Sequence, residues 1–194
     1  MAINLVKGQK ISLAKSDGGA LKHLMVGLGW DLPLIKLQAF DLDAFALVCG
    51  EDGKIDDFKD VVYFANLTHK TGAIKHLGDN LTGAGDGDDE QMTIDLTRIP
   101  ENYSKIVLGV CIYQGDKRNQ HFGKVKNAFV RLVDSDTNQE MCRYELSADK
   151  RFDGQRTMVF GEVYRRNGEW KFSAIGEGAP EASITPAFAG TYIR

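Results

Sequence analysis

Apolar and polar residues alternate along much of this chain with a period of two, which is typical of β-strands that bury one face. The clearest example is Leu24, Val26, Leu28 and Trp30, which are separated by single residues. Similar strand-like segments are predicted at residues 9–13, 40–49, 61–67, 92–96, 106–113, 129–133, 141–146, 158–164 and 170–174. Only residues 120–127 have the character of a short helix.

Turn-forming residues separate these segments at regular intervals. Residues 134–138 and 165–169 each predict a β-hairpin, and the Asn167-Gly168 pair is a strong hairpin signal. Many short strands with few helices predict an all-β fold, a single-domain β-sandwich. We expect this domain to span residues 1–176. Residues 177–194 are weakly patterned, which predicts a tail that packs as a loose arm or is partly mobile.

The composition is that of an ordinary soluble domain. The chain has 194 residues, 43% of them hydrophobic, and a net charge of −3, so no overall charge draws it toward nucleic acid. It has neither a signal-peptide pattern nor an apolar run of roughly 20 residues. The cysteines Cys49, Cys111 and Cys142 are scattered through apolar segments. This pattern predicts reduced core cysteines and a cytoplasmic protein.

An acidic, glycine-rich stretch at residues 78–90 is the most unusual feature, and residues 77–97 contain no Lys or Arg. Clustered carboxylates and backbone carbonyls are the ligands that Ca²⁺ prefers, and glycines allow the backbone to turn those carbonyls inward. The alternative is a solvated acidic turn. An EF-hand is excluded, because Leu81, Gly83 and Ala84 stand where side-chain ligands and the required Gly belong.

A second acidic signal lies in the strand predicted at residues 40–49. Asp41 and Asp43 are two residues apart and therefore share one face of that strand. Adjacent carboxylates on an apolar strand are costly without a cation, so we interpret them as metal ligands rather than as a strand end in solvent. Asn66 and Asp31, which end other strand-like segments, are weaker candidates.

These segments together resemble the tellurium-resistance TerD-domain family. The matching segments are residues 26–31, 40–44, 78–83, 85–90 and 160–172, and the resemblance runs from about residue 2 to about residue 176. It implies a calcium-binding β-sandwich that holds two ions near one end. It also implies a role in tellurite resistance and stress response, with other proteins of those systems as partners, some of them membrane-associated. The candidate metal ligands are Asp31, Asp41, Asp43, Asn66, Asp79, Asn80, Asp86, Asp88, Asp89 and Glu90.

The sequence contains no recognisable catalytic motif. It lacks a nucleophile elbow, a phosphate-binding loop and a dinucleotide-binding motif, and its four histidines lack metal-ligand spacing. His76 lies three residues before Asp79 and is interpreted as a hydrogen-bonding residue, with a general base as the alternative. We therefore expect an interaction module rather than an enzyme. A metal-dependent hydrolase remains open, as does a lipid-docking module with Leu81 and residues 32–34 as apolar tips.

Overall fold

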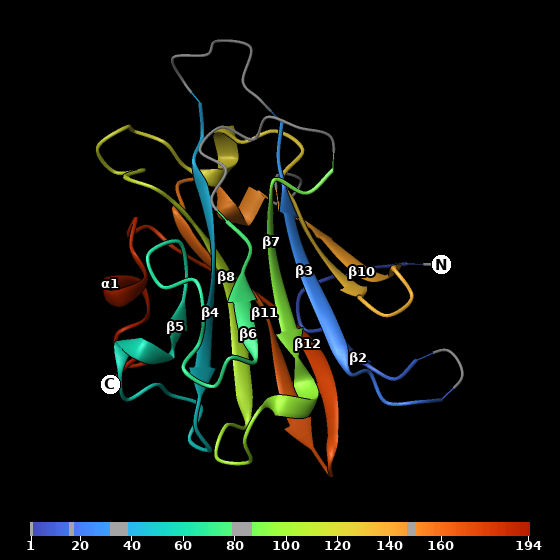
Figure 1. Ribbon diagram of the computed structural model, residues 1–194. Coiled ribbons are helices and arrows are strands. Elements are labelled where there is room, and N and C mark those ends of the chain that lie inside the picture. The colour runs from blue at the N-terminus through green and yellow to red at the C-terminus, as the bar shows by residue number, and fades with distance from the viewer. Residues whose placement is uncertain (1, 16–17, 32–38, 79–86, 147–149) are drawn as a thin grey trace.

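The computed structural model describes residues 2–15, 18–31, 39–78, 87–146 and 150–194, which form two β-sheets packed face to face (Figure 1). The first sheet has the order β1-β10-β9-β3-β7-β6. Its strands are β1 (Ile3–Asn4), β10 (Gln139–Glu145), β9 (Phe129–Asp134), β3 (His23–Gly29), β7 (Glu90–Asp95) and β6 (Ile74–His76). The second sheet has the order β2-β12-β11-β8-β4-β5. Its strands are β2 (Lys10–Ser12), β12 (Glu169–Ala179), β11 (Thr157–Arg166), β8 (Lys105–Ile112), β4 (Leu42–Cys49) and β5 (Val61–Val62).

Helices are few and short, as predicted. The described residues contain one α-helix, α1 (Ile184–Phe188). They also contain four short 3₁₀ turns: η2 (Phe58–Asp60), η3 (Leu96–Arg98), η4 (Phe122–Lys124) and η5 (Lys150–Phe152). The helix predicted at residues 120–127 is therefore only the single turn η4. The all-β prediction is confirmed.

The apolar alternation decides which residues face the interior. Along β7, Met92 and Ile94 are buried between the sheets, and the alternating residues Gln91, Thr93 and Asp95 are only partly covered. The Asn167-Gly168 pair connects β11 to β12 with φ values of 54° and 77°. Two successive positive φ values belong to the turn type that matches the twist of a hairpin, so this prediction is confirmed.

The strand predicted at residues 61–67 is wrong beyond Val62, because the chain turns back on itself there. The backbone N–H of Tyr63 donates to the carbonyl of Asn66 at 3.2 Å, and the N–H of Asn66 donates to the carbonyl of Tyr63 at 2.9 Å. The side-chain amide of Asn66 also donates to the carbonyl of Val61 at 2.6 Å. Aromatic and β-branched residues in this segment gave a strand pattern that the local turn overrides.

A second apolar core lies on the outer face of the second sheet and contains the C-terminal segment. It consists of Phe45, Leu47, Cys49, Ile55, Val61, Val107, Val159, Ile184, Phe188, Tyr192 and Ile193. The ring of Phe188 lies 6.1 Å from that of Phe45 and 5.7 Å from that of Tyr192, measured between centroids. The tail thus extends β12 to Ala179 and then packs closely through α1, rather than as a loose arm.

All three cysteines are buried and form no disulfide, as predicted for core residues. Burial raises the pKa of Cys49 and of Cys142 to about 12, so both thiols stay protonated at neutral pH. Among the described residues there is no helix with the length and apolar character that crossing a membrane requires.

The packing of α1 against the second core can be tested through the stability of a Phe188 variant. Phe188→Ala should lower the free energy of unfolding by about 3 kcal/mol, because it removes a buried ring and leaves a cavity against Phe45. Phe58→Ala is the matched control, because Phe58 is 42% exposed, and it should change stability by about 0.5 kcal/mol or less. Urea unfolding measures both variants, and equal effects would contradict a packed tail.

Candidate metal site

Asp41 and Asp43 lie at the start of β4, and both are buried. Strand alternation turns Leu42 and Ala44 into the core between the sheets, so the two carboxylates belong to the opposite, outer face. Cys111 is the cross-strand neighbour of Asp43 on β8, and its thiol donates to Asp43 Oδ2 at 3.9 Å. The sequence prediction that the two carboxylates share a face therefore agrees with the packing of β4.

Glu90 reaches this place from the other sheet. Its carboxylate is buried at the start of β7, and its Oε2 accepts a hydrogen bond from the backbone N–H of Ala44 at 2.7 Å. Burial raises the pKa of the Cys111 thiol well above its usual value, and the negative charges of Asp43, Glu90 and Asp41 add to that effect. The negative charges of carboxylates from both β4 and β7 therefore reach the same thiol, that of Cys111.

His76 lies directly behind Glu90. Its Nε2 is 3.4 Å from Glu90 Oε2, and neither side chain has exposed surface. Its Nδ1 accepts the backbone N–H of Gly78 at 3.3 Å. His76 thus contacts both a candidate ligand and the residue at which the acidic stretch begins.

Asp88 and Asp89 have different surroundings. The buried carboxylate of Asp88 accepts two hydrogen bonds from Arg131 on β9, from Nε at 2.7 Å and from Nη2 at 2.9 Å. Asp89 Oδ2 instead accepts the backbone N–H of Trp30 at 2.9 Å. Burial raises the pKa of Asp89, and the nearby charges of Asp88 and Asp31 act in the same direction.

Two glycines of β3 make room for the end of the acidic stretch. A Cβ atom at Gly27 would collide with the Asp88 carboxylate, and one at Gly29 would come within 2.5 Å of the carbonyl of Gly87. The backbone N–H of Asp89 donates to the carbonyl of Leu28 at 2.8 Å. The Gly-x-Gly pattern before Trp30 therefore allows the acidic stretch to lie directly on β3.

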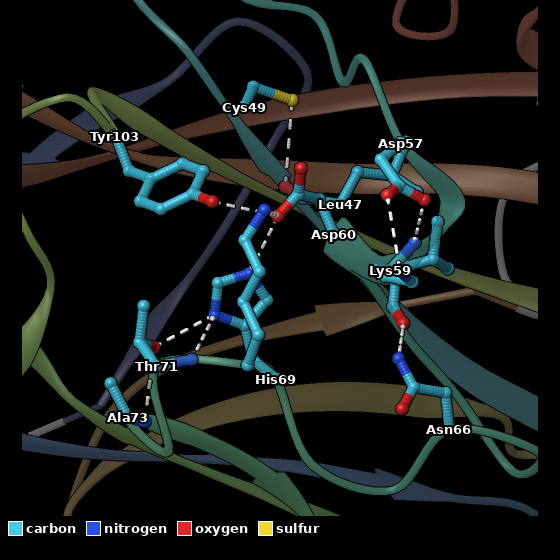
Figure 2. A network of polar contacts seen from close by, with 12 residues as sticks. Leu47, Cys49, Asp57, Lys59, Asp60, Asn66, His69, Thr71, Ala73 and Tyr103 are labelled. Atoms are coloured by element: carbon cyan, nitrogen blue, oxygen red, sulfur yellow. Dashed lines mark hydrogen bonds and ion pairs between the residues drawn. The ribbon is translucent and has the colours of Figure 1, made fainter.

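The two weaker candidates lie at other places. Asp31 is exposed and accepts the side-chain amide of Asn127 at 2.5 Å, although its charge still acts on Asp89. Asn66 uses its amide nitrogen within its own turn, as Figure 2 illustrates. It lines a hollow together with Lys59 and Lys70, whereas Asp43 lines a different and larger cavity.

Asp79, Asn80 and Asp86 lie outside the described residues. Within the described ranges, no group of three or more His, Cys, Asp or Glu side chains is arranged to hold a metal ion. Asp41, Asp43, Asp89 and Glu90 are all described, so these four predicted ligands do not form a metal-holding cluster by themselves. Carboxylate oxygens fit a hard cation such as Ca²⁺. The neighbouring Cys111 thiol is held in its protonated form, so it does not offer the thiolate that a softer metal would prefer.

Sequence reasoning missed a second buried polar network, which surrounds Asp60 (Figure 2). Asp60 Oδ1 accepts hydrogen bonds from His69 Nε2 at 3.0 Å, Lys70 Nζ at 2.8 Å and the Tyr103 hydroxyl at 2.8 Å. Burial alone would raise the pKa of Asp60, but these donors outweigh burial and lower it. Burial lowers the pKa of His69, whose Nδ1 lies 2.8 Å from the Thr71 hydroxyl. The network fixes η2 against the loop before β6.

Comparison with known proteins identifies the family of the chain. The sequence model of the TerD domain matches residues 1–185. The chain belongs to the TerD domain family. The tellurium resistance protein TerD of Serratia marcescens is 44% identical over 178 residues, covering 92% of this chain and 91% of that protein. The stress response protein SCP2 of Bacillus subtilis (strain 168) is 43% identical over 196 residues, covering 95% and 96%.

A solved structure extends the TerD family likeness to the fold. The homologue of telluride resistance protein (TerD) from Streptomyces coelicolor A3(2) has a TM-score of 0.71 at 25% identity. The match covers 90% of this chain and 100% of that one. The family predicted from the acidic motifs is therefore confirmed, and its members are named for tellurium resistance and stress response.

The Arg131–Asp88 pair gives a prediction about the acidic stretch. Arg131→Met should lower the free energy of unfolding by about 3 kcal/mol, because it leaves a buried carboxylate without its guanidinium. Adding Asp88→Asn to Arg131→Met should restore much of that loss. Arg194→Met is the control, because Arg194 pairs only with the exposed carboxylates of Asp52 and Asp56 in the described part of the chain. Chemical denaturation measures all three, and a loss no larger than the control's would contradict the pairing.

Proposed function

We propose that this TerD-family protein binds calcium and acts as a calcium-dependent interaction module in a cytoplasmic stress response that includes tellurite resistance. The observation that carries the proposal is that buried carboxylates of Asp41 and Asp43 lie at the start of β4, and that the buried Glu90 of β7 reaches the same strand at Ala44. Buried like charges repel one another strongly in a low dielectric, and a bound cation relieves that repulsion.

Asp41, Asp43, Asp89 and Glu90 are the described residues that would hold calcium. Asp79, Asn80 and Asp86 are the proposed remaining ligands from the acidic stretch. When bound, the ion supplies positive charge that balances the carboxylates of the two sheets. Asp88 has a separate part, because its pair with Arg131 fastens the end of the acidic stretch to the first sheet. His76 accepts the Gly78 N–H and lies against Glu90.

The surroundings of His76 favour an interaction module over a hydrolase. A general base must reach the proton of an attacking water, yet the His76 side chain has no exposed surface. One ring nitrogen accepts the Gly78 N–H and the other faces Glu90. The proposed apolar tips of a lipid-docking module, Leu81 and residues 32–34, lie outside the described residues. We therefore propose that the module binds other stress-response proteins.

Calcium binding is the first test. Titration calorimetry on chelator-stripped protein should detect about two Ca²⁺ ions per chain. Mg²⁺ should compete poorly, because it demands a smaller and more rigid octahedral site. Asp43→Asn should weaken at least one of these events, whereas Asp153→Asn, at a carboxylate that is 72% exposed, should leave both unchanged. Absence of calcium uptake at millimolar concentration would refute the metal site.

Thermal stability is the second test. Ligand that binds only the folded state stabilises it by about 2.7 kcal/mol at a hundredfold excess over the dissociation constant. The Tm of the wild-type chain should therefore rise with Ca²⁺, and scanning calorimetry in chelator and in excess Ca²⁺ measures that rise. Asp43→Asn should reduce the rise, and Asp153→Asn should preserve it. Identical melting curves with and without chelator would mean that the carboxylates are merely hydrated.

A further inference from the structure

A cavity of about 540 Å³ lies on the outer face of the second sheet, beside the second core. Three segments that are distant in sequence form its walls. They are residues 58–64 around β5, the chain that leaves β8 at residues 113–117, and residues 180–186, which lead into the first turn of α1. Asp43 and Cys111 also line it. The volume is within the range of pockets that bind small molecules or inserted side chains.

Aromatic rings dominate one wall of this cavity. Phe58, Tyr63, Phe64 and Tyr113 form a continuous series of edge-to-face contacts, with centroid separations of 5.7, 5.1 and 5.8 Å. Phe58, Phe64 and Tyr113 are nevertheless 42%, 37% and 37% exposed. Exposed aromatic side chains that gather at a hollow mark a binding surface, because isolated apolar residues on a surface do not share contacts in this way.

The charge of the lining favours a cation. Asp43, Asp116 and Glu181 contribute three carboxylates, and Lys117 contributes one ammonium group, which gives a net charge of −2. Aromatic faces carry negative quadrupoles that also attract cations. An anion would meet the buried carboxylate of Asp43 and the net negative charge of the lining.

The same chemistry already occurs within the chain beside this cavity. The guanidinium of Arg118 lies 5.6 Å from the centre of the Tyr113 ring and 4.0 Å from Asp41 Oδ2. One arginine therefore contacts both an aromatic wall residue and the carboxylate that precedes Asp43 by two positions. The cavity offers a second combination of aromatic ring and carboxylate to a group from outside.

We propose that this cavity is a docking site for an arginine side chain presented by an apolar segment of a partner protein. The exposed rings extend around the mouth and would contact the apolar residues on either side of the arginine. Guanidinium is favoured over ammonium, because it is planar, weakly hydrated and stacks on aromatic rings. Arginine and aromatic residues are also enriched at protein–protein interfaces.

This site deepens the proposed interaction-module function and rests on it, and Asp43 links the two because it belongs both to the candidate metal site and to the cavity lining. Titrations are therefore run with the full chain both in chelator and in excess Ca²⁺. Calcium binding is measured by calorimetry on the same samples. Calcium uptake without peptide binding in either condition would refute the docking site and leave the calcium proposal standing. Peptide binding without calcium uptake would refute the calcium proposal and leave the docking site standing.

The probe is the peptide acetyl-Leu-Arg-Leu-amide, titrated into ¹⁵N-labelled protein and followed by NMR. We expect saturable shifts at the amides of Phe64, Tyr113 and their neighbours. The matched peptide with citrulline in place of arginine keeps the shape and loses the charge, and should bind about tenfold more weakly. Equal binding of the two peptides would refute recognition of a cation.

Variants of the aromatic wall complete the test. Tyr113→Leu and Phe64→Leu keep apolar area but remove the ring, and each should weaken arginine-peptide binding about two- to fivefold. Tyr113→Phe keeps the ring and should bind like the wild-type chain. Titrations with spermidine and with free arginine show whether the cavity prefers a small cationic molecule or an arginine within a peptide. If either binds as tightly as the peptide, the cavity takes a small molecule and the proposed protein partner is wrong. Absence of binding by the peptide also refutes the proposal.

Discussion

The hydrogen bond from the Ala44 N–H to the Glu90 carboxylate joins the two sheets at their acidic end, and the candidate site depends on it. It brings the buried carboxylate of Glu90 on β7 to the strand that carries the buried carboxylate of Asp43. Water cannot solvate these groups freely, so their repulsion has to be balanced within the protein or by an ion. The placement of His76 and Gly78 around Glu90 follows from the same constraint.

The carboxylates of the acidic stretch differ in how their charge is balanced. Asp88 is paired with Arg131, which is a structural arrangement, because a bidentate guanidinium satisfies both carboxylate oxygens. Asp89 accepts the backbone N–H of Trp30, and its raised pKa reflects its burial close to other acids. An acidic cluster in a sequence is therefore not one functional unit, and its members separate into anchors and candidate ligands.

The outer face of the second sheet carries both the candidate ligand Asp43 and the cavity proposed to bind a partner. Phe45 and Leu47 on β4 pack against the C-terminal segment, while Asp43 on the same face lines the aromatic cavity. The tail that covers the second core also forms one wall of that cavity. A change in charge at Asp43 would therefore be felt at both places, because a single side chain belongs to the candidate metal site and to the cavity.

The sequence by itself determined most of the long strands, the hairpin at Asn167-Gly168 and the shared face of Asp41 and Asp43, because these depend on neighbours in the chain and on a period of two. Its acidic motifs also determined the family. Only the tertiary structure decided that Arg131 neutralises Asp88, that Glu90 reaches Ala44, and that the tail packs over β4. Each of these contacts joins residues more than forty positions apart. Such pairs are set by the order of strands in the sheets and by how the sheets stack, which no local pattern encodes.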